Sequence, residues 1–290
     1  MDWSKAHRIF WDSEVWREKR RDCNWEKKVH TDLVWREIEP YLRPGKKVLD
    51  AGAGYGRYSI PLARAGCEVV HLDLSSQMIR KAQTQAEKEG LFNIHFVEGK
   101  VENLSSFADY SFDLVLSLDA PVSYAHPREK AALFELARVS REALIVSVVN
   151  RLGQLPVAIE MELKVRKSLA ISWDFFRKGN WEHPQIFQAW EDRLSFLSRF
   201  IFPPFHAFMP EELVDMLLEV KFNPRRIVAT GTLARLLPRR TLKKIVRDRV
   251  LYQDFLELSS LYDSQFEVLG VGSRVASGLL VVAERGKDNG

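Results

Sequence analysis

The sequence predicts a doubly wound α/β fold, in which helices cover both faces of a parallel sheet. Three observations lead to this prediction. Short apolar runs typical of buried strands alternate with amphipathic helical patterns over residues 45–150. The strand-like runs at residues 47–50, 68–72 and 112–118 are each followed, further along the chain, by a segment that is expected to be helical. The run Phe112-Asp113-Leu114-Val115-Leu116 suits a strand that is covered on both faces.

The expected elements follow one another with right-handed crossovers between parallel strands. The expected strands span residues 47–50, 68–72, 94–97, 112–118 and 144–149, and the expected helices span residues 58–65, 76–90 and 127–140. Gly66 ends the first of these helices, and a proline stands in the first turn of the last one.

The regions on either side of this core differ from it in composition. Residues 1–44 are expected to form an N-terminal helical cap, residues 45–150 the cofactor-binding core, residues 151–212 a helical and aromatic insertion, and residues 213–290 the C-terminal part with strands near 226–229 and 279–283. The insertion is expected to act as a lid over the substrate, or to pack as a satellite core, because it is rich in aromatic residues. These are Trp173, Phe175, Phe176, Trp181, Phe187, Trp190, Phe196, Phe200, Phe202, Phe205 and Phe208.

Composition bounds the possible functions. The 290 residues are 46% hydrophobic and 28% charged, with a formal net charge of +4 that permits an anionic partner without requiring one. The two cysteines lack the spacing of a metal site or a disulfide framework, so no metal is expected. No signal peptide and no apolar stretch near the roughly 20 residues that span a bilayer are found, which predicts a cytoplasmic protein.

The turn Asp50-Ala51-Gly52-Ala53-Gly54-Tyr55-Gly56 joins the first strand to a helix and is the main candidate binding site. Glycines let the backbone approach a ligand closely, and the helix N-terminus favours a negatively charged group. Arg57 replaces the third glycine of a dinucleotide fingerprint, and a Walker A loop is absent. Asp73, at the end of the second strand, stands where such folds bind ribose hydroxyls. The pair suits an adenosine ligand with an amino-acid tail.

The segments Val48–Arg57, His71–Met78, Gly99–Leu104 and Phe112–Ser117 together resemble the motifs of class I S-adenosylmethionine-dependent methyltransferases. The resemblance implies a seven-stranded, mostly parallel sheet of order 3-2-1-4-5-7-6 with the last strand antiparallel. It implies S-adenosylmethionine as cofactor and S-adenosylhomocysteine as product. The residues expected to bind the cofactor are Asp50, Gly52, Gly54 and Gly56 for the methionine part, Asp73 for the ribose, Leu74, Met78, Val101 and Glu102 for the adenine, and Leu118. Lys100 departs from the family pattern, which has an aspartate there, and lysine has no acceptor for the adenine amino group.

The loop after the fourth strand supplies the catalytic candidates. Asp119, Tyr124 and His126 are expected to orient or deprotonate the acceptor. The alternative is that these residues cap the turn, pack in the core and face solvent, respectively. Ala120 and Val122 break the motif of enzymes that methylate base amino groups. In-line placement of the nucleophile can supply most of the rate enhancement. His183 and His206, in the insertion, are expected to be packed or surface histidines.

A basic amphipathic run at residues 235–249 bears on the acceptor. It is expected to form a solvated helix packed on the body of the protein, and the alternatives are an RNA-binding surface or a peripheral contact with an anionic membrane. No RNA-binding module is recognisable, which disfavours nucleic acid. The expected function is methyl transfer to a small molecule, apolar or aromatic in character. The alternatives are an RNA or protein methyltransferase that uses the basic helix, and a non-catalytic cofactor-binding partner protein.

Overall fold

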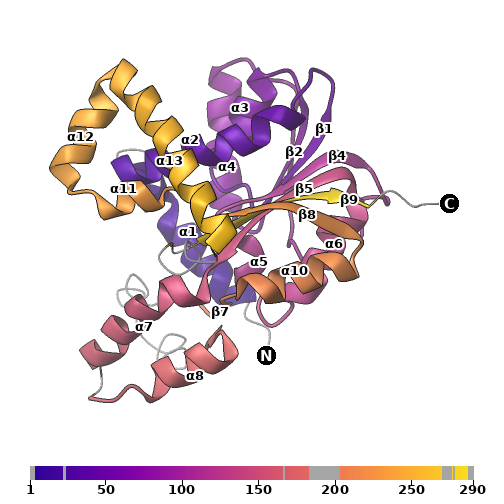
Figure 1. Cartoon of the computed structure of the whole chain (residues 1–290). Helices are drawn as coiled ribbons and strands as arrows, with labels where there is room; N and C mark the ends of the chain where they lie inside the picture. The colour runs from indigo at the N-terminus through magenta and orange to yellow at the C-terminus, as the bar shows by residue number, and fades with distance from the viewer. Residues whose placement is uncertain are drawn as a thin grey trace.

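A central sheet with helices on both faces organises the chain in the computed structural model (Figure 1). The structure describes residues 4–21, 24–165, 167–182, 203–269, 276 and 278–286. The α/β class predicted from the alternation of strands and helices is confirmed.

The sheet has seven strands in the order β3-β2-β1-β4-β5-β9-β8. Their bounds are β1 Lys47–Ala51, β2 Glu68–Asp73, β3 Ile94–Glu98, β4 Phe112–Ser117, β5 Ser140–Val149, β8 Phe222–Val228 and β9 Gly278–Arg285. The first five strands pair in parallel, and β9 is antiparallel to both of its neighbours. The labels differ from the predicted 3-2-1-4-5-7-6 because two short strands, β6 and β7, precede β8 in the chain and form a separate sheet.

Successive residues of each central strand pack alternately into two apolar layers, one on each face of the sheet. Because both faces are covered, the strands appear in the sequence as continuous apolar runs. Leu49 packs in the layer with α6 (Glu129–Val139) and α10 (Pro210–Glu219). Val48 packs in the opposite layer with α2 (Trp25–Ile38) and α3 (Ser59–Arg64). The helix α4 (Ser76–Lys88) lies beside α3 (Figure 1). Both faces of the sheet are therefore buried, as a doubly wound fold requires.

A third apolar cluster joins the N-terminal region to the C-terminal helices. Val29 and Leu33 of α2 pack against α11 (Thr232–Leu236), α12 (Arg239–Arg247) and α13 (Arg249–Leu269). The basic run was expected to be one helix, but it is divided among these three because the chain is extended at Leu237-Pro238 and at Asp248. Its basic residues are exposed on the outside of this cluster.

The insertion after β5 consists of α7 (Arg151–Val165), α8 (Ala170–Lys178), β6 (Asn180–Trp181) and β7 (Phe205–His206) in its described part. Phe175, Trp181 and Phe205 are buried against one another, with Trp181 and Phe205 stacked 6.3 Å apart. The predicted aromatic residues Phe187, Trp190, Phe196, Phe200 and Phe202, and His183, lie outside the described residues. The rings that are described thus pack largely as a satellite core, while Trp173 and Phe176 are exposed.

Two short helical elements were not predicted from the sequence. These are the helix α5 (Pro121–Tyr124), directly after β4, and the 3-10 helix Glu39–Tyr41. The N-terminal helix α1 (Ser4–Arg21) crosses the end of the sheet where the parallel strands terminate. Among the described helices, none combines the length and the apolar character needed to cross a bilayer.

Candidate functional site

The glycine turn between β1 and α3 forms the floor of a cavity at the carboxyl ends of the parallel strands. Gly52 and Gly54 both have positive φ, +81° and +57°, which residues with a Cβ rarely adopt. A Cβ on Gly52 would lie 2.6 Å from Cβ of Pro121 and closer still to its Cγ. A Cβ on Gly54 would have no atom within 4 Å and would project into the cavity. Gly56 also has a positive φ, +89°, but it does not line the cavity.

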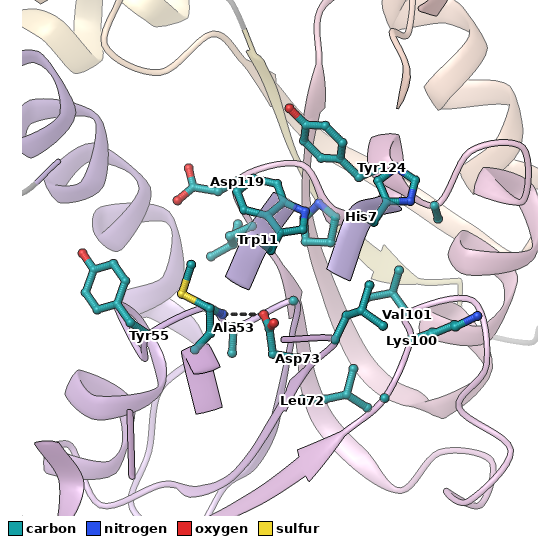
Figure 2. Close-up of a pocket in the computed structure, with 18 of the residues that line it drawn as sticks. His7, Trp11, Ala53, Tyr55, Leu72, Asp73, Lys100, Val101, Asp119 and Tyr124 are labelled. Atoms are coloured by element: carbon teal, nitrogen blue, oxygen red, sulfur yellow. Dashed lines mark hydrogen bonds between the residues drawn. The ribbon is translucent and has the colours of Figure 1, made fainter. Parts of the chain in front are cut away.

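Asp73 ends β2 with its carboxylate at the cavity. Its Oδ2 accepts a hydrogen bond from the backbone N–H of Gly54 at 2.7 Å (Figure 2). Its Oδ1 accepts one from the backbone N–H of Ser75 at 2.8 Å. Burial raises the pKa of Asp73 to about 6, against these two bonds, which lower it. Since a carboxylate offers about four acceptor positions, Asp73 fixes the glycine turn and still has lone pairs for a ligand's hydroxyl groups.

Asp50 differs from the expectation that its side chain binds the ligand. It is 1% exposed and lies beneath the turn, where its Oδ2 accepts a hydrogen bond from Ser59 Oγ at 2.5 Å. The Ser59 hydroxyl also lies 2.9 Å from Nδ1 of His71. Burial raises the pKa of Asp50 to about 7 and lowers that of His71 to about 3. The physical reason is strand alternation: Asp50 points into the layer below the turn, away from the cavity.

The helix α1 roofs the cavity, which the sequence patterns did not reveal. Figure 2 shows His7 and Trp11 across the cavity from Leu72 and Asp73. Three contacts hold α1 in this place: His7 Nε2 lies 2.8 Å from the carbonyl oxygen of Pro204, Arg8 pairs with Glu98 at 2.8 Å, and Ser75 Oγ donates to Asp12 at 2.5 Å. The spacing of His7 and Trp11, one helical turn apart, was the signal in the sequence that they share a face.

The far end of the cavity gathers the residues expected around the adenine. Leu74, Met78, Val101 and Glu102 all line it, together with Lys100. Met78 is 2% exposed and lies in the first turn of α4, where the side chain of the N-cap residue Ser75 accepts a hydrogen bond from the Met78 N–H at 3.1 Å. The apolar surfaces of Leu74, Met78 and Val101 suit the two faces of a flat ring, and Glu102 offers the acceptor that Lys100 lacks.

At the other end, Leu118 and Asp119 close the cavity where β4 ends. Asp119 and Ala120 both have left-handed backbone conformations, with φ of +63° and +73°. Two successive non-glycine residues in this region are uncommon, and such strain concentrates at functional sites. The carboxylate of Asp119 lies 3.6 Å from Nε2 of His30 and 3.7 Å from Nε of Arg57.

A second cavity adjoins the first and shares three residues with it: Trp11, Asp119 and Tyr124. Its aromatic wall includes Phe10 and Phe205, and its polar wall includes Glu14, Lys27, His30, Thr230 and Arg235. Nδ1 of His30 lies 2.7 Å from Thr230 Oγ1, which aligns the ring toward Asp119. His30 is a further polar residue at the junction that sequence patterns did not single out.

The two other catalytic candidates lie in different surroundings. Tyr124 ends α5 and faces both cavities, where its ring meets Trp11 edge-on at 5.2 Å. His126 lines neither cavity and is 5% exposed, packed between Glu129 and Glu182. Burial lowers the pKa of His126 and the two carboxylates raise it more, so the net shift is upward. The expected site residues Asp50, Gly56 and His126 thus stand outside the cavities, and the others line them.

Comparison with known proteins relates the segment around this site to a family. The sequence model described as "Methyltransferase domain" matches residues 48–143, the segment from β1 through most of the parallel sheet. Residues 48–143 thus match the methyltransferase-domain family, and the strand order of the sheet is that of the class I S-adenosylmethionine-dependent methyltransferase fold.

Curated relatives match part of the chain. An uncharacterized protein of Mycobacterium tuberculosis is 40% identical over 109 residues, and the tRNA 5-carboxymethoxyuridine methyltransferase of Escherichia coli is 35% identical over 89 residues. These matches cover 38% and 29% of this chain. They span 38% and 34% of the relatives' own lengths. The chain thus spans only about a third of the length of these curated relatives.

Solved structures match over most of the chain and show the fold. The magnesium protoporphyrin IX methyltransferase of Synechocystis, crystallised with SAH, aligns with 97% of this chain and 99% of its own at a TM-score of 0.58 and 18% identity. A SAM-dependent methyltransferase of Methanosarcina mazei aligns with 86% of this chain and 96% of its own at a TM-score of 0.53 and 21% identity.

Proposed function

We propose that this protein transfers a methyl group from S-adenosylmethionine to a small molecule held in the second cavity. The observation that carries the proposal is the junction of the two cavities at Trp11, Asp119 and Tyr124. In the first cavity, Asp73 would hold the ribose of the cofactor and Leu74 and Val101 would hold its adenine, while Leu118 and Asp119 would face its methionine part. The methyl group would then face the second cavity.

The cofactor fits the residues that line the first cavity. The carboxylate of Asp73 has lone pairs that can accept hydrogen bonds from the two ribose hydroxyls. Gly54 has no side chain, which leaves room for the amino-acid tail of the cofactor beside the backbone. The cofactor supplies an activated methyl group on a sulfonium. The acceptor's lone pair forms the new bond to the methyl carbon while the carbon–sulfur bond breaks and leaves S-adenosylhomocysteine.

The chain's own part is to position the acceptor and receive its proton. Asp119, oriented by Arg57 and His30, stands at the junction and accepts a hydrogen bond or a proton from the nucleophile. Tyr124 and Trp11 supply aromatic surface for a planar group. The roof formed by α1 excludes water from the reacting atoms. The polar wall with Arg235 and Glu14 favours an acceptor that is flat at one end and polar at the other.

An RNA acceptor is the second candidate. Two observations favour it: the exposed basic residues of α12, which include Arg239, Lys243 and Arg247, and the similarity to a bacterial tRNA methyltransferase. Phosphate contacts by such residues make binding fall steeply with salt.

Methyl-labelled S-adenosylmethionine separates these candidates. The purified chain is incubated with a cell extract fractionated into low-molecular-mass compounds, RNA and protein, and the label is followed. We expect label in the low-molecular-mass fraction. Label confined to RNA, with binding to bulk tRNA that weakens steeply with salt, would support the second candidate and overturn the first. No label in any fraction would favour a non-catalytic role.

A further inference from the structure

Two histidines and one glutamate converge beside the cofactor cavity. His126 follows α5, Glu129 begins α6, and His206 lies in β7 of the insertion. Each offers a ligand atom, and these atoms lie within 4.8 Å of one another. His126 and His206 are both 5% exposed, so the cluster is largely out of contact with solvent.

The atoms at the centre of this cluster have unmet bonding capacity. Among the described residues, Nδ1 of His126 and Oε2 of Glu129 are buried without a hydrogen-bond partner, although they lie 3.3 Å apart. Nδ1 of His206 lies 3.9 Å from Oε1 of Glu129. In a tetrahedral zinc site with bonds of about 2.1 Å, neighbouring ligand atoms are roughly 3.4 Å apart. The separations therefore suit three ligands of one ion.

The outer nitrogen of each histidine is held by a carboxylate. Nε2 of His126 contacts Glu182, and Nε2 of His206 lies 2.8 Å from Oε1 of Glu212. Arg151 fixes Glu212 in turn at 2.7 Å. Metal-binding histidines commonly donate their second N–H to a carboxylate, which orients the ring and leaves the other nitrogen for the metal.

We propose that His126, Glu129 and His206 bind one divalent transition-metal ion, with Zn²⁺ as the best fit. Two imidazoles and one carboxylate are a donor set typical of zinc, whereas Mg²⁺ and Ca²⁺ prefer oxygen ligands alone. Oδ1 of Asn180 lies 2.6 Å from Nδ1 of His206, and the ion takes the place of this contact or adds the Asn180 oxygen as a ligand. One of these ligands, His126, was expected to orient or deprotonate the acceptor, but it lines neither cavity. The three residues form no recognisable metal-binding motif in the sequence.

The ion fastens the insertion to the core. His206 is adjacent to Phe205, which lines the second cavity, and His126 is two residues from Tyr124, which lines both. Linking β7 to the start of α6 through one ion holds both walls of the acceptor cavity at a fixed separation. Its role is structural, because none of its ligands reaches either cavity.

Calorimetric titration of the tag-free full chain with Zn²⁺, after removal of metals by a chelator, tests the proposal. We expect one ion per chain, and a loss of affinity of at least about 10-fold in His206→Gln and of about 10–100-fold in Glu212→Gln. His95→Gln, an exposed histidine on β3, is the matched control and is expected to bind as the wild type does.

Co²⁺ gives an independent readout, because its visible absorption reports the nitrogen and oxygen ligands around it. The absorption is expected in the wild type and in His95→Gln and is expected to be lost in His206→Gln. Circular dichroism checks that each variant folds, and Glu129→Gln replaces His206→Gln if the latter does not. Absence of Zn²⁺ binding by the wild type, or unchanged affinity in the folded His206 or Glu129 variant, would overturn the proposal.

Discussion

Replacement of Gly52 by alanine tests how the glycine turn is packed against the start of α5. Gly52 has φ of +81°, and an added Cβ would lie 2.6 Å from Cβ of Pro121, inside normal contact distance. The proline ring is rigid and begins α5, so it cannot move aside without shifting the helix that carries Tyr124.

The expected loss of stability has two parts. A left-handed conformation costs an alanine about 1–2 kcal/mol relative to glycine. Overpacking against Pro121 adds about 1–3 kcal/mol. Gly45 separates the two parts, because it has the same φ of +81° with no atom within 4 Å of an added Cβ. We therefore expect Gly45→Ala to lose about 1–2 kcal/mol and Gly52→Ala to lose about 2–5 kcal/mol.

Urea unfolding of the three proteins, followed by fluorescence and circular dichroism, measures these differences. Equal free energies of unfolding for Gly45→Ala and Gly52→Ala would refute the packing of Gly52 against Pro121. Gly54→Ala adds a contrast within the turn: with no neighbour within 4 Å, it is expected to match Gly45→Ala in stability but to bind the cofactor more weakly.

Three further predictions concern charge. Burial raises the pKa of Asp50 to about 7, so the native state retains a proton that the unfolded state loses above pH 4. Asp50 therefore contributes a fall in stability of up to about 4 kcal/mol from pH 4 to 7, and Asp50→Asn should remove this contribution while those of Asp73 and His71 remain; an unchanged pH dependence of unfolding would place its source elsewhere. Asp119→Asn should lower kcat about 100-fold or more while cofactor affinity is retained, and an unaltered kcat would limit Asp119 to a structural role. The double variant Lys243→Glu, Lys244→Glu should leave small-molecule methylation unchanged, since both side chains are exposed on α12; a loss of turnover would point to a polyanionic acceptor.

The sheet was predictable because its strands are buried on both faces. Leu114, Val115 and Leu116 alternate between the two apolar layers, and this produces the continuous apolar run that marks a parallel strand. The start of β8 was less predictable, because the strand begins at Phe222, four residues before the expected Arg226. The pairing of β8 with β9 continues across an irregularity between Pro224 and Arg226, which a strand can accommodate as a bulge.

The cofactor cavity was predictable where its residues are close in sequence to the strand ends. Asp73 ends β2, Leu74 follows it directly and Met78 lies in the first turn of α4, so all three are near the carboxyl end of this strand. His7 and Trp11 reach the same cavity only through the docking of α1, which depends on contacts with distant segments such as Pro204. No local pattern encodes that docking.

The cluster of His126, Glu129 and His206 was likewise not predictable from local sequence patterns. His126 and His206 come from the core and the insertion, and the pairing of β6 with β7 brings Asn180 beside His206. His206 was expected to be a packed or surface histidine, whereas His126 was a catalytic candidate with a solvent-facing position as the alternative. Both histidines are buried in the structure. Their meeting at Glu129 is a property of the tertiary structure.

Calorimetric titration with S-adenosylhomocysteine tests the central claim most directly. The wild type is expected to bind one equivalent, and Asp73→Ala is expected to bind more weakly by about 1–3 kcal/mol, which is about 5–150-fold, because the ribose hydroxyls lose their acceptor. Asp174→Ala, an exposed carboxylate of α8 outside both cavities, is the control and is expected to match the wild type. No binding by the wild type, or equal affinity in a folded Asp73→Ala variant, would contradict the assignment of this cavity to the cofactor.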